Sequence, residues 1–158
     1  NSPFRNNFSI AIVSIIMALL MFISDNHNKK LVNIKKHSFI NVFIIGIAQS
    51  FAIIPGVSRS GITISTAFFL GWERHDAAKF SFLLGIPAIT LAALVEIFSS
   101  IQNLSSFSLV NILISLFTAF ISSFFAIDFL INYLSKRGLK VFVYYRLIFG
   151  LLILLSYL

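Results

Sequence analysis

The chain alternates between long apolar runs and short polar segments, and the lengths of the runs predict the elements. Residues 8–24, 80–98, 110–134 and 141–158 are almost unbroken apolar sequence. A helix rises about 1.5 Å per residue, and the hydrocarbon core of a bilayer is about 30 Å thick. Runs of this length therefore suit membrane-spanning helices, and we predict four of them within a single membrane domain over residues 1–158.

The polar segments between the runs predict the orientation of these helices. Segments 25–37 and 135–140 carry most of the lysine and arginine between the runs, whereas segment 99–106 carries no charge. Lysine and arginine gather in the cytoplasmic loops of membrane proteins. We therefore expect the first two segments on the cytoplasmic side and segment 99–106 outside.

The apolar stretch 39–70 differs from the others because Pro55 and Gly56 interrupt it. The orientation of its neighbours requires this stretch to enter and leave the membrane by the cytoplasmic face. Its second arm, 60–70, is too short to cross a bilayer. The pattern therefore predicts a re-entrant helical hairpin with its tip at residues 55–61, and an all-α polytopic fold of about four transmembrane helices plus this hairpin.

Composition supports the membrane class and excludes others. Hydrophobic residues make up 58% of the 158 residues, charged residues 11%, and the mean hydropathy is +0.97. A soluble domain carries roughly 25% charged residues. The net charge of +7 lies largely in the loops, where it suits anionic lipid headgroups. We therefore expect membrane lipids and no nucleic acid as partners, and because the chain starts at Asn1 we expect it to be part of a longer protein.

The hairpin tip carries the residues that point to a chemistry. Residues 55–63 read PGVSRSGIT. Ser58 is a suitable N-cap for the second arm, whose first N–H groups are then free to bind an anion. Arg59 adds a permanent cation, which is costly inside a membrane, and Thr63 follows one turn later, where it can face the same cavity. Since all these groups donate hydrogen bonds, the tip predicts a phosphate site.

For several of these residues there are also interpretations without a role in catalysis or binding. Arg59 could reach the membrane surface while the small residues of the tip only allow close helix packing; the combination at the tip favours the phosphate site. Arg146, in the last apolar run, could face the cavity, pair with Asp128 or reach the cytoplasmic boundary. Arg74 is expected to pair within its own loop, and Ser81 to pack as a small residue.

No acidic residue lies within the tip. The five acids are Asp25, Glu73, Asp76, Glu96 and Asp128. Cleavage of a phosphoanhydride normally uses carboxylates that hold a metal ion, or a base that activates the nucleophile. We therefore expect no metal ligands in this chain, and the tip to be half of a site.

At these residues the chain resembles the undecaprenyl-diphosphatase family, also called the BacA/UppP bacitracin-resistance family. Three strings carry the resemblance: QSFAIIPGVSRSGIT at 49–63, GWERHDAAKFSFLLGIP at 71–87 and FVYYRLIFG at 142–150. The resemblance implies a fold of six membrane helices and re-entrant hairpins in two inverted repeats. This chain would be the C-terminal repeat, because the glutamate-rich motif of the family's N-terminal repeat does not occur in it.

The resemblance also implies an activity. Family members hydrolyse undecaprenyl diphosphate to undecaprenyl phosphate and inorganic phosphate, which recycles the carrier lipid for peptidoglycan synthesis and confers bacitracin resistance. They depend on a divalent cation, Mg²⁺ or Ca²⁺. Their site lies in the bacterial inner membrane and opens to the periplasmic side.

Carried over to this chain, the family motif assigns catalytic positions and substrate-binding positions. Arg59, Ser58 and Thr63 are expected to be catalytic. The expected substrate-binding residues are Ser60, Gly56, Gly61 and Arg146. Metal ligands are expected from an N-terminal repeat, either in the same protein or on another chain. The sequence also leaves open a homo-oligomer. The alternatives are a transporter that flips the lipid phosphate and a non-catalytic fragment of a split gene.

Overall fold

The computed structural model describes residues 6–28, 38–100 and 109–156. Every regular element in these ranges is helical. The elements are α1 (Asn7–Asn28), α2 (Phe39–Ser50), the 3₁₀ turn η2 (Phe51–Ile53), α3 (Arg59–Phe69), α4 (Arg74–Ser100), α5 (Leu109–Arg137) and α6 (Lys140–Leu155). The predicted uncharged loop at 99–106 and the basic segment at 25–37 fall mostly outside the described residues.

Within the part of the chain that the structure describes, three helices are long and apolar enough to cross a membrane. They cover Asn7–His27, Arg74–Ser99 and Val110–Arg137, with mean hydropathies of 2.3, 2.0 and 2.1. These lie in α1, α4 and α5, so the predicted all-α polytopic class is confirmed. Helix α6 has 16 residues and is shorter than these three. A membrane crossing by α6 therefore stays a prediction.

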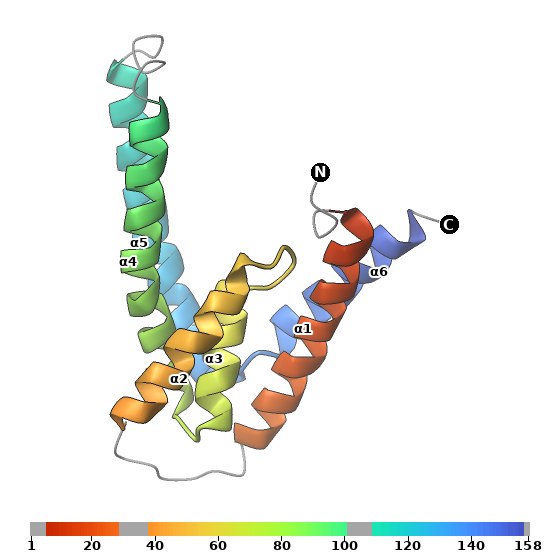
Figure 1. Ribbon diagram of the computed structural model, residues 1–158. Coiled ribbons are helices and arrows are strands. Elements are labelled where there is room, and N and C mark those ends of the chain that lie inside the picture. The colour runs from red at the N-terminus through yellow and green to blue at the C-terminus, as the bar shows by residue number, and fades with distance from the viewer. Residues whose placement is uncertain (1–5, 29–37, 101–108, 157–158) are drawn as a thin grey trace.

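The helices form two pairs with the α2–α3 hairpin between them (Figure 1). Helices α4 and α5 run side by side, and their far halves project beyond the rest of the molecule. Helix α1 packs along α6, and α3 contacts α1, α2 and α4. The buried core lies around the C-terminal half of α3 and includes Phe68, Ile45, Met21 and Trp72. The exposed surface of α4 and α5 is apolar, as expected where lipid is the solvent.

The helical hairpin predicted over 39–70 is present as α2, η2 and α3. Gly56 has φ +96°, a conformation that favours glycine, and it reverses the chain at the tip. Ser58 then caps α3: its backbone is extended, and its Oγ accepts a hydrogen bond from the N–H of Gly61 at 3.1 Å. The local signals therefore produced the expected turn. The depth of this hairpin in a membrane stays a prediction.

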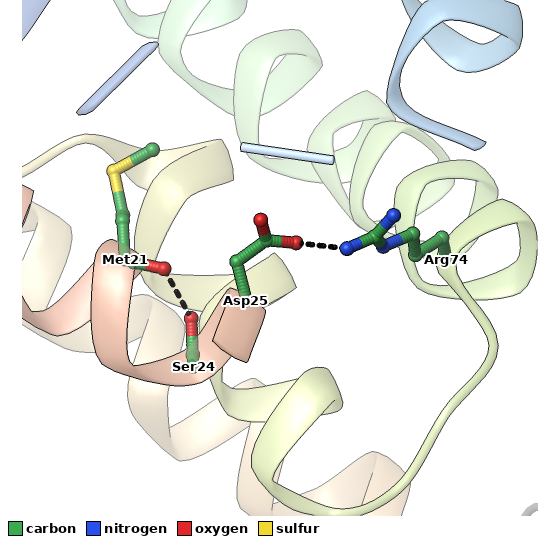
Figure 2. Close-up of polar contacts among 4 residues, drawn as sticks. All are labelled: Met21, Ser24, Asp25 and Arg74. Atoms are coloured by element: carbon green, nitrogen blue, oxygen red, sulfur yellow. Dashed lines mark hydrogen bonds and ion pairs between the residues drawn. The ribbon is translucent and has the colours of Figure 1, made fainter. Parts of the chain in front are cut away.

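A largely buried ion pair joins two helices at the other end of the core. Figure 2 shows Arg74 at the start of α4 directed at Asp25 near the end of α1, with 2.6 Å between Nη2 and Oδ1. Ser24, beside it, donates to the carbonyl of Met21 at 2.9 Å. Arg74 is therefore not confined to a pairing within its own loop, as its sequence neighbours suggested. Arg74 and Asp25 lie 49 residues apart in the sequence, and their ion pair joins α4 to α1.

Candidate functional site

The start of α3 presents backbone donors that the fold leaves free. Gly61 donates to Ser58 Oγ, and Ile62 donates to the carbonyl of Ser58 at 2.8 Å. Among the described residues, the N–H groups of Arg59 and Ser60 have no such partner. The positive end of the α3 dipole lies behind them. This arrangement is suited to an anion, and to phosphate in particular.

The side chain of Arg59 also has a hydrogen-bond donor without an acceptor. Its Nη1 atom is buried and has no hydrogen-bond partner within the described ranges. Its guanidinium lies against Gly85 of α4, in the place that a β-carbon on Gly85 would take. A buried charged donor without an acceptor costs free energy, because its lost hydration is not replaced. An anion beside Arg59 would remove that cost.

Thr63 lies on the same face of α3 as Arg59, and this face is turned toward α4. Its side chain is buried, and its Oγ1 lies 2.6 Å from Ser81 Oγ. Thr63 Oγ1 is also 3.0 Å from the carbonyl of Arg59, to which it donates. The Thr63 hydroxyl is therefore engaged within the protein, and Thr63 does not line the cavity at the tip. Arg59, on the same face of α3, does not line that cavity either, so the expected place of Thr63 at the site stays a prediction.

Ser81 is a residue whose contribution sequence reasoning missed. It was expected only to pack as a small residue, but it makes the polar contact with Thr63. The signal was its spacing: Ser81 and Gly85 are four residues apart on α4, as Arg59 and Thr63 are on α3. Residues at this spacing share a helix face. Two such pairs facing each other form one polar contact strip between the helices.

A cavity of about 200 Å³ opens beside the tip, on the side toward α5 and α6. Ser58, Ser60 and Gly61 line it on the side of the tip. Its other walls are mostly apolar side chains, namely Met21, Ile64, Phe82, Leu130, Leu134, Leu139 and Phe142. A polar end with apolar walls suits an amphiphile whose headgroup binds at the tip.

Arg146 reaches the tip from α6. Its Nη1 donates to the carbonyl oxygen of Gly56 at 2.9 Å. Asp128, a partner considered from the sequence, instead accepts from Asn132 on its own helix at 3.3 Å. Arg146 also borders the cavity beside Ser58 and a second cavity of about 270 Å³ on the α1 side of the tip.

The structure therefore divides the predicted site residues into two groups. Ser58, Ser60, Gly61 and Arg146 meet at the cavity. Gly56 accepts a hydrogen bond from Arg146 and lines the second cavity with it. Arg59 and Thr63 are directed toward α4, as Gly85 and Ser81 show.

A divalent cation does not fit these residues. Within the described ranges, no group of three or more His, Cys, Asp or Glu side chains is placed to hold a metal ion. The tip presents hydrogen-bond donors, whereas Mg²⁺ and Ca²⁺ require oxygen ligands. The residues of the tip are therefore suited to an anion and not to a cation.

Comparisons with known proteins show what the chain as a whole is similar to. Residues 1–152 match the family model described as "Bacitracin resistance protein BacA". The chain is 58% identical to an undecaprenyl-diphosphatase of Prochlorococcus marinus (strain MIT 9515), over 99% of the chain and 59% of that relative. It is 46% identical to the undecaprenyl-diphosphatase of strain MIT 9303, over 97% of the chain and 52% of that relative. The chain thus spans between 52% and 59% of the length of these two curated relatives.

Proposed function

The chain belongs to the bacitracin resistance protein BacA family, and on that premise we propose that it supplies the phosphate-binding repeat of an undecaprenyl-diphosphatase. In the proposed reaction the oxygen of water attacks the terminal phosphorus of undecaprenyl diphosphate. The bond from that phosphorus to the bridging oxygen breaks, which yields undecaprenyl phosphate and inorganic phosphate. The reaction would take place at the outer face of the bacterial inner membrane, with the site open to the periplasm, and would return carrier lipid to peptidoglycan synthesis.

The observation that carries the proposal is that Arg59 Nη1 is buried without a hydrogen-bond partner, at a helix start where the N–H groups of Arg59 and Ser60 are also free within the described ranges. A diphosphate has enough oxygens to accept from all of them at once. Hydrogen bonds to charged groups contribute roughly 1.5–3 kcal/mol each. The apolar walls next to Ser58 and Ser60 would take the first part of the polyprenyl chain.

Each residue has a distinct part in this proposal. Arg59 stabilises the charge that develops on the transferring phosphoryl group. Ser58 and Ser60 donate to phosphate oxygens from the polar end of the cavity. Gly61 admits the close approach of Ser58, whose Oγ would lie 3.1 Å from a β-carbon at position 61. Thr63 acts through its bonds to the backbone of α3 and to Ser81 and is a positioning residue.

The nucleophile and the divalent cation are outside what these residues supply. The resemblance implies Mg²⁺ or Ca²⁺, and ligands for it would come from outside this chain. We propose that the part of the relatives that this chain does not span provides them. A chain with only the binding half should hold the lipid diphosphate without cleaving it.

The test is release of inorganic phosphate from undecaprenyl diphosphate in detergent with Mg²⁺. The chain is assayed alone and mixed with the segment of the MIT 9515 relative that it does not match. We expect release in the mixture only, and none when the chain carries Arg59→Ala. Arg137→Ala, an exposed arginine away from the tip, is the matched control and should retain full release. Full release with Arg59→Ala would contradict the proposed site, and lipid movement without release would favour the transporter.

A further inference from the structure

The peptide unit between Gly56 and Val57, one residue before Ser58, is held at both of its ends. Arg146 donates to the carbonyl oxygen of Gly56 at 2.9 Å. The N–H of the same peptide unit belongs to Val57 and donates to the carbonyl of Ile54 at 3.1 Å. With both its polar groups bonded, this unit has one orientation, and the chain enters the cap of α3 from it.

Gly56 is also packed closely against α1. A β-carbon at position 56 would lie 2.9 Å from the carbonyl oxygen of Ile10 and 3.0 Å from Cβ of Val13. The tip is therefore enclosed between α1 and the side chain of Arg146. Figure 1 shows the connection between α2 and α3 on the side of the hairpin that faces α1 and α6.

Helix α6, which carries Arg146, packs closely against α1. Gly150 lies four residues after Arg146 and so on the same face of α6. A β-carbon on Gly150 would lie 2.7 Å from Cγ1 of Ile15 and 3.1 Å from the carbonyl of Ala11 on α1. The face of α6 that carries Arg146 is thus the face that packs against α1. The small residue at position 150 allows the approach.

We propose that Arg146 is a positioning residue that fixes the tip through the Gly56 carbonyl, and not a phosphate ligand. This rests on the proposed function, because the tip is the proposed phosphate site. A carbonyl oxygen carries partial negative charge, which would repel a phosphate two residues away. Arg146 holds that oxygen toward α6 with a charged hydrogen bond, which is strong in a low-dielectric interior. The N–H groups after it then stay directed at the anion.

The test is amide hydrogen exchange of the chain in detergent, read at Val57 and Gly61. Both amides are hydrogen-bonded at the tip, to Ile54 and to Ser58 Oγ. Arg146→Gln should speed their exchange by about tenfold or more, because the tip opens more often without the charged bond. The amides of α5 should be unchanged. Arg137→Gln removes an equal charge away from the tip and should leave all rates unchanged.

Two further variants keep the test decisive if Arg146→Gln fails to fold. Arg146→Lys keeps the charge with a different geometry and should give an intermediate rate. Gly150→Val keeps arginine at position 146 but should move α6, and Arg146 with it, away from α1. It should therefore also speed exchange at Val57 and Gly61. Exchange at these two amides as slow as in the unmodified chain, in whichever variants fold, overturns the proposal.

A binding measurement separates this inference from the proposed function. Inorganic pyrophosphate is titrated into the same samples. If the unmodified chain binds none, the proposed function fails, while the exchange rates still decide the role of Arg146. If Arg146→Gln weakens pyrophosphate binding and leaves exchange at the tip unchanged, Arg146 is a phosphate ligand and the positioning role is wrong.

Discussion

The guanidinium of Arg59 lies in the space that a β-carbon on Gly85 would occupy. Arg59 begins α3, and Gly85 lies in the interior of α4. Because Gly85 has no side chain, α4 leaves space at this point for the guanidinium of Arg59. The end of an arginine side chain is flexible, and a small addition at position 85 would shift it without unfolding the protein.

Substitution of Gly85 should therefore act on Arg59 in proportion to size. Gly85→Ala should lower phosphate release by the active mixture several-fold at most, because the guanidinium can move aside. Gly85→Val, which adds a branched side chain, should lower release by about tenfold or more, as expected when one charged interaction worth roughly 1.4 kcal/mol is lost. Release is measured with helical content as the folding control. Equal activity of Gly85→Val and the unmodified chain would show that Arg59 does not act from this position.

Arg59→Lys should retain part of the activity that Arg59→Ala loses. Lysine keeps the positive charge but lacks the planar pair of donors that matches two phosphate oxygens. We expect phosphate release between those of the unmodified protein and Arg59→Ala, with the larger loss in kcat. If the lysine and alanine variants are equally inactive, the fork geometry and not the charge is what the site requires.

Thr63→Val and Ser81→Ala should both lower activity, because each removes the contact between α3 and α4. Thr63→Val should lower it somewhat more, because it also removes the bond to the Arg59 carbonyl. The loss in stability should be about 1 kcal/mol for either variant. The double variant should be little worse than each single one. A Thr63 that touched phosphate would give a different result: Thr63→Val would lose far more activity than Ser81→Ala.

Asp25→Asn should destabilise the protein strongly. Asp25 is 2% exposed and Arg74 20%, so removal of the carboxylate charge leaves a largely buried guanidinium uncompensated. Breaking such a pair costs about 3 kcal/mol or more. The measurement is denaturant unfolding in detergent, followed by circular dichroism. Glu73→Gln changes the exposed acid next to Arg74 and is the matched control, with an expected change below about 0.5 kcal/mol.

Gly138→Ala should be destabilising through the same ion pair. Gly138 has φ +72°, and a β-carbon there would overlap Oδ1 of Asp25 and lie 2.8 Å from Oδ2. We expect a loss of at least about 1 kcal/mol from the backbone conformation alone. Gly46→Ala, where a β-carbon meets nothing within 4 Å, should instead be neutral or slightly stabilising in the same unfolding experiment. Equal stabilities of the two variants would contradict the tight packing at Gly138.

Features that depend on neighbours in the chain were predicted well from the sequence. The apolar runs at 8–24, 80–98 and 110–134 lie within α1, α4 and α5, because run length against bilayer thickness is a local criterion. Gly56 and Ser58 predicted the tip for the same reason, since a turn and a helix cap are made by a few consecutive residues.

Contacts between helices were decided only by the tertiary structure. Membrane helices are apolar on nearly every side, so their sequence gives little indication of which face meets which neighbour. That is why the partner of Arg74 was sought in its own loop and found in Asp25, and why Arg146 had three candidate partners before Gly56 proved to be the one. The sequence by itself determined the class, the helices and the donors of the tip. The packing of α3 against α4 and of α6 against α1 determined where those donors point.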